Sequence, residues 1–207
     1  QQAGGGGGGG LPADEPAPPS NPSPGSCPSL VSPAAVAPSS HSSSRPAACS
    51  FLQFNCDGLR STLAELKDFL SNSAVKVACL QETKLTAKAK TPSFPDYSVL
   101  RQDRPAGGGG GLMILIHHSV QFTVFDVSLI SQNDATIEIQ AVTVSINNAP
   151  INVFNFYVPP PSSCPPRYKP DFPAIFNIAD SDSLFLGDAN AHHAAWFSVT
   201  SCDQAAA

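Results

Sequence analysis

The stretch LFLGDANAHHAAW, residues 184–196, places a carboxylate, an amide and two imidazoles directly after a short apolar run. The run SLFLGD predicts a buried strand over residues 183–188, and the polar side chains follow at its carboxyl end. In sheets flanked by helices that end opens into a crevice, so polar residues there commonly form a site. Asp188 and Asn190 are therefore candidate site residues, and the other strand ends decide what kind of site it is.

The composition is that of one ordinary domain with a tail. The chain has 207 residues, of which 42% are hydrophobic, enough for a real core. A formal net charge of −5 argues against a highly basic coat protein for nucleic acids and leaves room for a local basic patch. The six cysteines include no CxxC pair, which favours reduced intracellular thiols over a disulfide framework. No apolar run approaches the roughly 18 residues of a membrane span, and no secretory signal is evident, so we expect an intracellular protein without a membrane partner.

Two regions of different composition follow one another along the chain. Residues 1–49 are nearly all Gly, Pro, Ala and Ser, cannot bury enough surface to offset their ordering entropy, and predict a disordered tail. This tail could be a spacer or a ligand for proline-binding domains. Residues 50–207 are rich in aliphatic and aromatic side chains and predict a folded domain. The chain begins with Gln1, which suggests a fragment.

The hydrophobic pattern of the second region predicts a mixed α/β sheet protein. A helix is predicted over 61–72, where leucines recur at helical spacing and Thr62 with Glu65 forms a capping-box pattern. A short segment at 173–179 has helical character. Strands are predicted at residues 51–55, 75–81, 112–116, 151–158 and 183–188.

Residues 136–146 show an alternation that changes phase. Ile137, Ile139 and Ala141 share one face of an extended chain, whereas Val142 and Val144 share the other. A bulge near Ala141 or a strand buried on both faces would explain this pattern.

Polar residues close several of the predicted strands. Asn55 ends the first, Glu82 the second, Tyr157 the strand before a proline-rich loop, and Asp188 the last. Each has an ordinary explanation by itself: Asn55 as a turn residue, Glu82 as a solvated charge, Tyr157 as a cap on the core, and Asp188 in an Asx-turn. The combination is less ordinary, because turns seldom require a carboxylate, an amide and a phenol at successive strand ends.

Such a set suits a hard divalent cation that acts on a phosphate. Mg²⁺ prefers oxygen ligands and keeps several waters, so one or two carboxylates suffice, and Glu82 is the natural ligand. Asp188 could then orient or deprotonate the attacking water, while Asn190 positions it and Tyr157 donates to the phosphate. His192 and His193 are adjacent and point in different directions, so one of them packing near Asp188 is favoured over a paired metal site.

The segments QFNCDGL, CLQETKL, RQDRPAGGGGGLMILIHHS, NVFNFYVPPPSSC and LFLGDANAHHAAW, in this order, resemble the endonuclease/exonuclease/phosphatase superfamily. They look specifically like the apurinic-like endonuclease domain of jockey-type non-LTR retrotransposons. The resemblance covers about residues 50–204. The glycine run and NAHH favour retroelements over repair enzymes.

This resemblance implies a four-layer α/β/β/α sandwich and a Mg²⁺-dependent phosphodiester hydrolase, with Mn²⁺ as a possible substitute. The enzyme would nick double-stranded chromosomal DNA in the nucleus so that the freed 3′ hydroxyl primes a reverse transcriptase domain of the same polyprotein. By motif position, Asn55 and Glu82 match the family's metal-site residues. Tyr157, Asp188 and Asn190 match its phosphate-binding and water-activating residues.

The sequence departs from the family pattern in two places. The family usually has GDFN where this chain has Ala189, and loss of an aromatic side chain could loosen the strand end. The family's terminal Ser-Asp-His motif does not occur in this sequence. His117 and His118 match no catalytic position. We therefore expect a domain that is incomplete at its C-terminus, weakly stable, and nearly or fully inactive as given.

Three alternatives remain at the level of sequence. Within the same fold, the chain could resemble an apurinic repair endonuclease, or a phosphoinositide or sphingolipid phosphodiesterase; in a different class, it could be a relic with only a binding role. A locally positive segment at residues 83–104 favours DNA, because it suits backbone phosphates, although it could be a solvated loop. Its cations are Lys84, Lys88, Lys90, Arg101 and Arg104.

Overall fold

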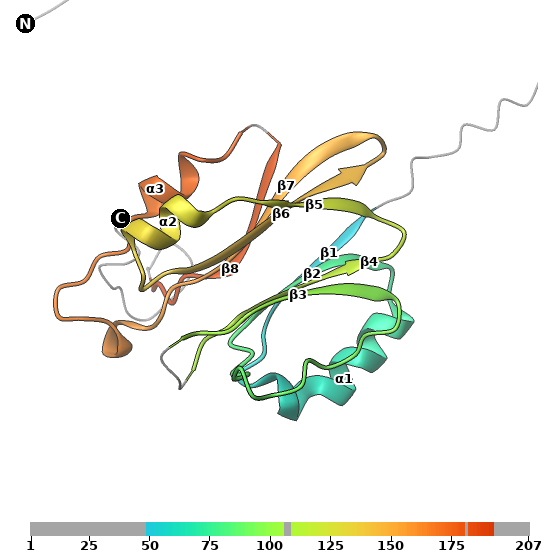
Figure 1. Ribbon diagram of the computed structural model, residues 1–207, viewed down its shortest axis with the longest axis horizontal. Helices are drawn as coiled ribbons and strands as arrows, with labels where there is room; N and C mark the ends of the chain where they lie inside the picture. The colour runs from blue at the N-terminus through green and yellow to red at the C-terminus, as the bar shows by residue number, and fades with distance from the viewer. Residues whose placement is uncertain (1–48, 106–108, 181, 193–207) are drawn as a thin grey trace, which may run out of the picture. The chain divides into compact units, whose positions relative to one another are not determined.

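The computed structural model describes residues 49–105, 109–180 and 182–192, which form two four-stranded sheets with helices (Figure 1). The first sheet has the order β1-β2-β4-β3 and the second the order β5-β6-β7-β8. Strands β1 and β2 are parallel, as are β7 and β8, and the remaining neighbours are antiparallel. The strands are β1 (Ser50–Asn55), β2 (Val75–Gln81), β3 (Tyr97–Gln102), β4 (Leu112–His117), β5 (Gln121–Phe125), β6 (Glu138–Ile146), β7 (Ala149–Tyr157) and β8 (Ser183–Asp188).

Helices cover the outer faces of both sheets (Figure 1). Helix α1 (Leu59–Asn72) packs on the first sheet through Leu59, Leu66 and Leu70. Helices α2 (Ser128–Asn133) and α3 (Phe172–Phe176) pack on the second, and a 3₁₀ turn, η1 (Pro161–Ser163), follows β7. The layers are therefore helix, sheet, sheet, helix, and the predicted α/β/β/α sandwich is confirmed.

A buried apolar layer joins the two sheets. Its fully buried members are aliphatic or thiol side chains from β2, β4, β6 and β7. The change of phase in residues 136–146 follows from this layer. Val142 and Val144 face the other sheet, whereas Ile139 and Ala141 face the helices. Strand β6 pairs with β7 without a break in register, so burial on both faces explains the pattern and a bulge does not.

Helix α1 begins two residues earlier than predicted, at Leu59, after Gly58 with a φ of 104°. The predicted capping box is wrong: Thr62 lies inside the helix, and its hydroxyl has no hydrogen-bond partner within the described part of the chain. The backbone N–H groups of Gly58 and Leu59 instead donate to the carbonyls of Glu82 and Thr83, at 2.8 and 3.0 Å. No side chain among the described residues caps the helix, and backbone hydrogen bonds to a neighbouring loop fix its start.

Other differences from the sequence-based expectations are local. Strands β3 and β5 and helix α2 had not been assigned from the sequence. The four cysteines in the described residues are free thiols. Within the same residues, no helix is long and apolar enough to cross a membrane. The predicted disordered tail and His193 lie outside the described residues, and the predicted domain boundary at residue 49 stays a prediction.

Candidate active site

The loops that follow β1 and β2 are joined by backbone hydrogen bonds. Beyond the last residue pair of the parallel ladder, the N–H of Cys56 donates to the carbonyl of Gln81 at 2.9 Å, and the bonds from Gly58 and Leu59 continue this pairing. The carboxyl ends of both strands therefore run side by side. This pairing carries Asn55 and Glu82, 27 positions apart in the sequence, to one place.

The Asn55 side chain bridges the two candidate carboxylates. Its Nδ2 donates to Glu82 Oε1 at 2.8 Å and to Asp188 Oδ2 at 2.7 Å, and the second bond connects the two sheets. Its Oδ1 accepts a hydrogen bond from the N–H of Asp57 at 3.0 Å. Asn55 is thus both a turn residue and a site residue, with a different atom for each task.

Glu82 adopts a backbone conformation with a φ of 50°, which is uncommon for a residue with a long side chain. The loop on both sides of it is fixed. Its carbonyl accepts from Gly58, and the next two N–H groups, of Thr83 and Lys84, donate to Gly111 and Gly110 at 3.0 and 2.9 Å. Strain held in this way is commonly found at functional sites. The predicted strand end at Glu82 is therefore a rigid loop that directs a carboxylate of 18% exposure inward.

Tyr157 lies in a row of three polar side chains across the second sheet. It is the direct pairing partner of Glu138 on β6 and of Asp188 on β8, so the three side chains share one face of the sheet. The Tyr157 side chain is buried, and its phenol lies beside the Glu82 carboxylate. Burial first, and then the charge of Glu82, hold the pKa of the phenol well above its usual range. Tyr157 therefore keeps its proton and can donate it in a hydrogen bond.

The end of β8 is built around Gly187 and an Asx-turn. A Cβ at Gly187 would lie 2.5 Å from the carbonyl oxygen of Phe156, so only glycine permits this close approach next to Asp188. Asp188 Oδ1 accepts from the N–H of Asn190 at 2.9 Å, which is the predicted Asx-turn, while its Oδ2 meets Asn55. The Asn190 side chain donates to the carbonyl of Val158 at 2.9 Å. The structure thus places Asn190 beside Asp188, and its predicted role toward water stays a prediction.

Four charged residues next to these groups were not among the predicted site residues. Lys84 Nζ lies 3.3 Å from Glu82 Oε2 and also pairs with Asp57, and the hydrogen bond to Asp57 is the main reason that the pKa of Lys84 is raised. Arg104 Nη2 lies 2.6 Å from Glu138 Oε1, and Glu138 Oε2 accepts from the N–H of Gly111 at 2.6 Å. Lys84 and Arg104 belong to the positive segment at residues 83–104, which the sequence predicts to bind backbone phosphates.

A buried amide network lies one residue further into the fold. Gln81 and Asn155 are both fully buried, and Gln81 Nε2 donates to Asn155 Oδ1 at 2.7 Å. Asn155 Nδ2 donates to the carbonyls of Leu80 and Met113, each at 3.1 Å. This network ties the second sheet to the first directly below the carboxylates, and it fixes the distance between the sheets at the candidate site.

His117 lies away from the candidate site. His117 ends β4, which is antiparallel to β2, so it sits beside the beginning of β2 and at the opposite end from Glu82. There it contacts Tyr97 and Ser119.

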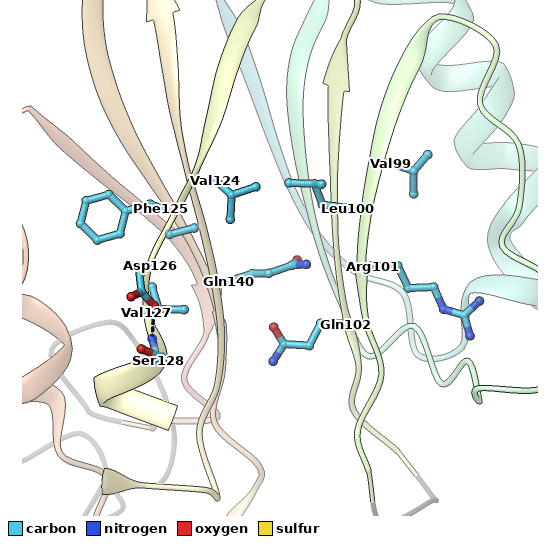
Figure 2. A pocket seen from close by; sticks show the side chains of 11 residues that line it. Val99, Leu100, Arg101, Gln102, Val124, Phe125, Asp126, Val127, Ser128 and Gln140 are labelled. Carbon is cyan, nitrogen blue, oxygen red and sulfur yellow. Dashed lines mark hydrogen bonds between the residues drawn. The ribbon is translucent and has the colours of Figure 1, made fainter. Parts of the chain in front are cut away.

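A separate hollow of about 690 Å³ lies between the edge strands β3 and β5 (Figure 2). Its lining is mostly apolar, with Leu100 and Val124 on opposite sides, and the guanidinium of Arg101 is directed away from it. Arg101 instead pairs with Asp103 and donates to the carbonyls of Thr86 and Ala89. The hollow contains none of the predicted site residues.

The side chains at the candidate site supply oxygen ligands of the kind that the predicted Mg²⁺ prefers. Within the described residues, no group of three or more His, Cys, Asp and Glu side chains gathers at one point. The two carboxylates of Glu82 and Asp188 do meet at the Asn55 amide, and Mg²⁺ is commonly bound through one or two carboxylates with waters. The residues present therefore fit a single hard cation. The bonds of Asn55 favour an orienting role for its amide.

One solved structure shares this fold, and others are similar over part of it. The endonuclease domain of TRAS1, a telomere-specific non-LTR retrotransposon, superimposes with a TM-score of 0.51 and 18% identity, over 74% of this chain and 64% of that one. This chain thus spans less than two thirds of that domain. An endonuclease/exonuclease/phosphatase family protein from Leptotrichia buccalis gives a TM-score of 0.49 with 14% identity, over 73% and 69%. TDP2 from D. rerio, in complex with a single-strand DNA product, gives 0.47 with 16% identity, over 70% and 61%.

No curated protein matches the chain in sequence. The sequence profile of the endonuclease/exonuclease/phosphatase family matches residues 52–205, which include every predicted site residue and both sheets except the first two residues of β1. The predicted family resemblance is confirmed, and the chain belongs to the endonuclease/exonuclease/phosphatase family.

Proposed function

We propose that this chain is a divalent-metal-dependent phosphodiester hydrolase that acts on DNA, of the type found in retrotransposon endonucleases. One observation carries the proposal: the Asn55 amide donates hydrogen bonds to both Glu82 and Asp188, which come from different sheets. Asp188 is 133 positions from Asn55 in the sequence. A packing role alone does not require two acidic side chains to meet in a half-buried place. Metal-assisted phosphodiester hydrolysis can use such a pair, with one carboxylate for the cation and one for the attacking water.

Each residue has a task that its contacts permit. Glu82 would hold the cation, Mg²⁺ or Mn²⁺, which when bound would neutralise charge on the phosphate. Asp188, held by Asn55 and by the N–H of Asn190, would orient and deprotonate the attacking water. Tyr157 would donate its phenolic proton in a hydrogen bond to a phosphate oxygen, since its raised pKa keeps it protonated. Asn190 would position the water once the substrate is present.

DNA is the substrate that the surface near the site favours. Lys88 and Lys90 are exposed in the segment that follows Glu82, where they can meet backbone phosphates. The other cations of this segment are held in ion pairs at or near the site. The segment therefore combines exposed charges for binding with fixed charges for structure. Action on chromosomal DNA would place the protein in the nucleus, and the nick would prime a reverse transcriptase of the same polyprotein.

A plasmid nicking assay tests the function. Relaxation of supercoiled plasmid would be followed with Mg²⁺, with Mn²⁺ and with a chelator, for the native sequence and for Glu82→Gln. The matched control is Glu65→Gln, an exposed acid on α1. We expect metal-dependent nicking that falls by about 10²-fold or more in Glu82→Gln and is unchanged in Glu65→Gln. The nicking rate of the native sequence also tests the expectation that the chain is weakly active.

Calorimetric titration with MnCl₂ provides a readout that does not depend on turnover. Binding that is present in the native sequence and lost in Glu82→Gln supports the proposal even where nicking is slow. Equal Mn²⁺ binding in both, or nicking that persists with a chelator, contradicts it. Cleavage restricted to abasic DNA, or of phosphoinositide headgroups, would assign one of the alternatives within the family.

A further inference from the structure

The phenol of Tyr157 reaches the candidate site from the rim of the second sheet, and the position of its ring determines where the hydroxyl lies. Tyr157 is the last residue of β7, and the proline-rich loop begins two residues later. The ring therefore has no further strand residues beside it on β7. The guanidinium of Arg104 lies over the ring, with its Cζ 5.6 Å from the ring centre. Cations at such distances are attracted to the faces of aromatic rings.

Arg104 is itself anchored by a buried acid. Its Nη2 lies 2.6 Å from Oε1 of Glu138, whose side chain is only 8% exposed. The second oxygen of Glu138 accepts from the N–H of Gly111, so both oxygens of this carboxylate are engaged. Because Glu138 pairs directly with Tyr157 across β6 and β7, the acid, the cation and the ring form one contiguous unit.

The glycine run permits this arrangement. Gly110 and Gly111 have φ values of 67° and 88°, which favour glycine. A Cβ at Gly110 would collide with Glu138 and would lie 2.8 Å from Nε of Arg104. The run therefore lets the backbone lie against the ion pair while its carbonyls receive the N–H groups of the loop that carries Glu82.

We propose that Arg104, anchored by Glu138, is a positioning residue that holds the Tyr157 ring so that its hydroxyl stays beside Glu82. The guanidinium acts through the ring and does not bind the substrate. The catalytic consequence rests on the proposed function, whereas the structural consequence does not. The competing role is direct binding of a DNA phosphate, since Arg104 also lines a hollow of about 530 Å³ with Lys84.

A double-mutant cycle separates the two roles. The nicking rate would be measured for Arg104→Gln in the native background and in the Tyr157→Phe background, with Lys67→Gln, an exposed cation on α1 outside the proposed DNA-binding segment, as the control. We expect Arg104→Gln to lower kcat by about tenfold to a hundredfold with little change in KM, and to have almost no effect when the hydroxyl is absent. Arg104→Lys, which keeps a cation over the ring, should restore most of kcat.

Two results would overturn the positioning role. Equal losses in both backgrounds would show that Arg104 does not act through the hydroxyl. A rise in KM that steepens with salt concentration would instead assign Arg104 to a phosphate contact. If Glu82→Gln nicks as fast as the native sequence, the proposed function fails, and a second measurement decides the positioning role by itself.

That measurement is NMR of tyrosine rings. The chain has three tyrosines, so selective labelling gives three ring signals, and Tyr157→Phe identifies one of them. Tyr97 and Tyr168 are internal controls, since their hydroxyls bind the carbonyl of Val75 and the carboxylate of Asp134. We expect a nuclear Overhauser effect between the Tyr157 ring and the Glu82 side chain that is lost in Arg104→Gln and kept in Lys88→Gln.

Removing Arg104 alone leaves a buried carboxylate without its partner, and the variant could fail to fold. The double variant Arg104→Gln, Glu138→Gln removes both charges together and avoids that problem. We expect the same loss of contact between the Tyr157 ring and Glu82. A contact that is retained in this double variant overturns the proposal.

Discussion

Replacement of Asn55 tests whether the two sheets meet at a pair of carboxylates. In Asn55→Ala, Glu82 and Asp188 lose a shared donor at 2.8 and 2.7 Å, and the Asp57 N–H loses its acceptor. Hydrogen bonds to charged groups contribute about 1.5–3 kcal/mol each and neutral ones about 1 kcal/mol. Because Asn55 is half-buried, water replaces part of this, and we expect the free energy of unfolding to fall by about 2–3 kcal/mol.

Asn55→Asp sharpens the test. It places a third carboxylate between two others, so repulsion adds to the lost hydrogen bonds and the loss should exceed that of Asn55→Ala. Added MgCl₂ should then stabilise Asn55→Asp more than the native sequence, because a cation that binds only the folded state shifts unfolding by mass action.

Urea unfolding followed by circular dichroism, with and without MgCl₂, measures both effects. The matched control is Asn72→Ala at the end of α1, where an exposed asparagine bonds to Asp68 only. A loss below about 0.5 kcal/mol in Asn55→Ala, equal to that of the control, would refute the convergence of the carboxylates. So would an Asn55→Asp variant that is as stable as the native sequence and indifferent to MgCl₂.

Three further outcomes follow from buried groups. Asn155→Leu removes three buried hydrogen bonds between the sheets and should lower the free energy of unfolding by about 3 kcal/mol in urea. Burial raises the pKa of the Glu138 carboxyl above its usual 4.5, so protonated Glu138 contributes stability below pH 4.5. This contribution is lost as the pH rises through the raised pKa. Glu138→Gln should remove this pH dependence of the free energy of unfolding, whereas Glu65→Gln should leave it. Burial also raises the pKa of Cys56 to about 12, so iodoacetamide at pH 8 should modify the half-buried Cys49 well before Cys56, as peptide mass spectrometry would show.

A role in a turn and a role in the candidate site are compatible for the polar residues at the strand ends. Asn55 and Asp188 each make the turn that sequence analysis offered as the ordinary alternative, and each uses its other side-chain atom to meet the opposite sheet. An Asx-turn fixes the side chain that makes it, so the turn gives the second atom a defined direction. Turn chemistry at these two strand ends therefore orients the site.

The local pattern was enough to predict a mixed α/β sheet protein, most strands and the residues that converge, whereas the four layers came from the family resemblance. Apolar runs that end in Asn55, Glu82, Tyr157 and Asp188 are properties of neighbouring positions, and parallel pairing brings such ends together wherever it occurs. The double-sided burial of β6 was visible as a change of phase for the same reason. The edge strand β5 was not predicted, because its residues are largely exposed and show no clear alternation of apolar and polar side chains.

Only the tertiary structure decided which polar groups accompany the site. Glu138 is 34 positions from Arg104 in the sequence, and neither residue type shows that Arg104 pairs with a buried acid while Lys88 stays exposed. The Asn155 and Gln81 amides likewise resemble any polar residue of a strand until the second sheet closes over them. Such pairings depend on the distance between two sheets, which long-range packing sets and which no short stretch of sequence encodes.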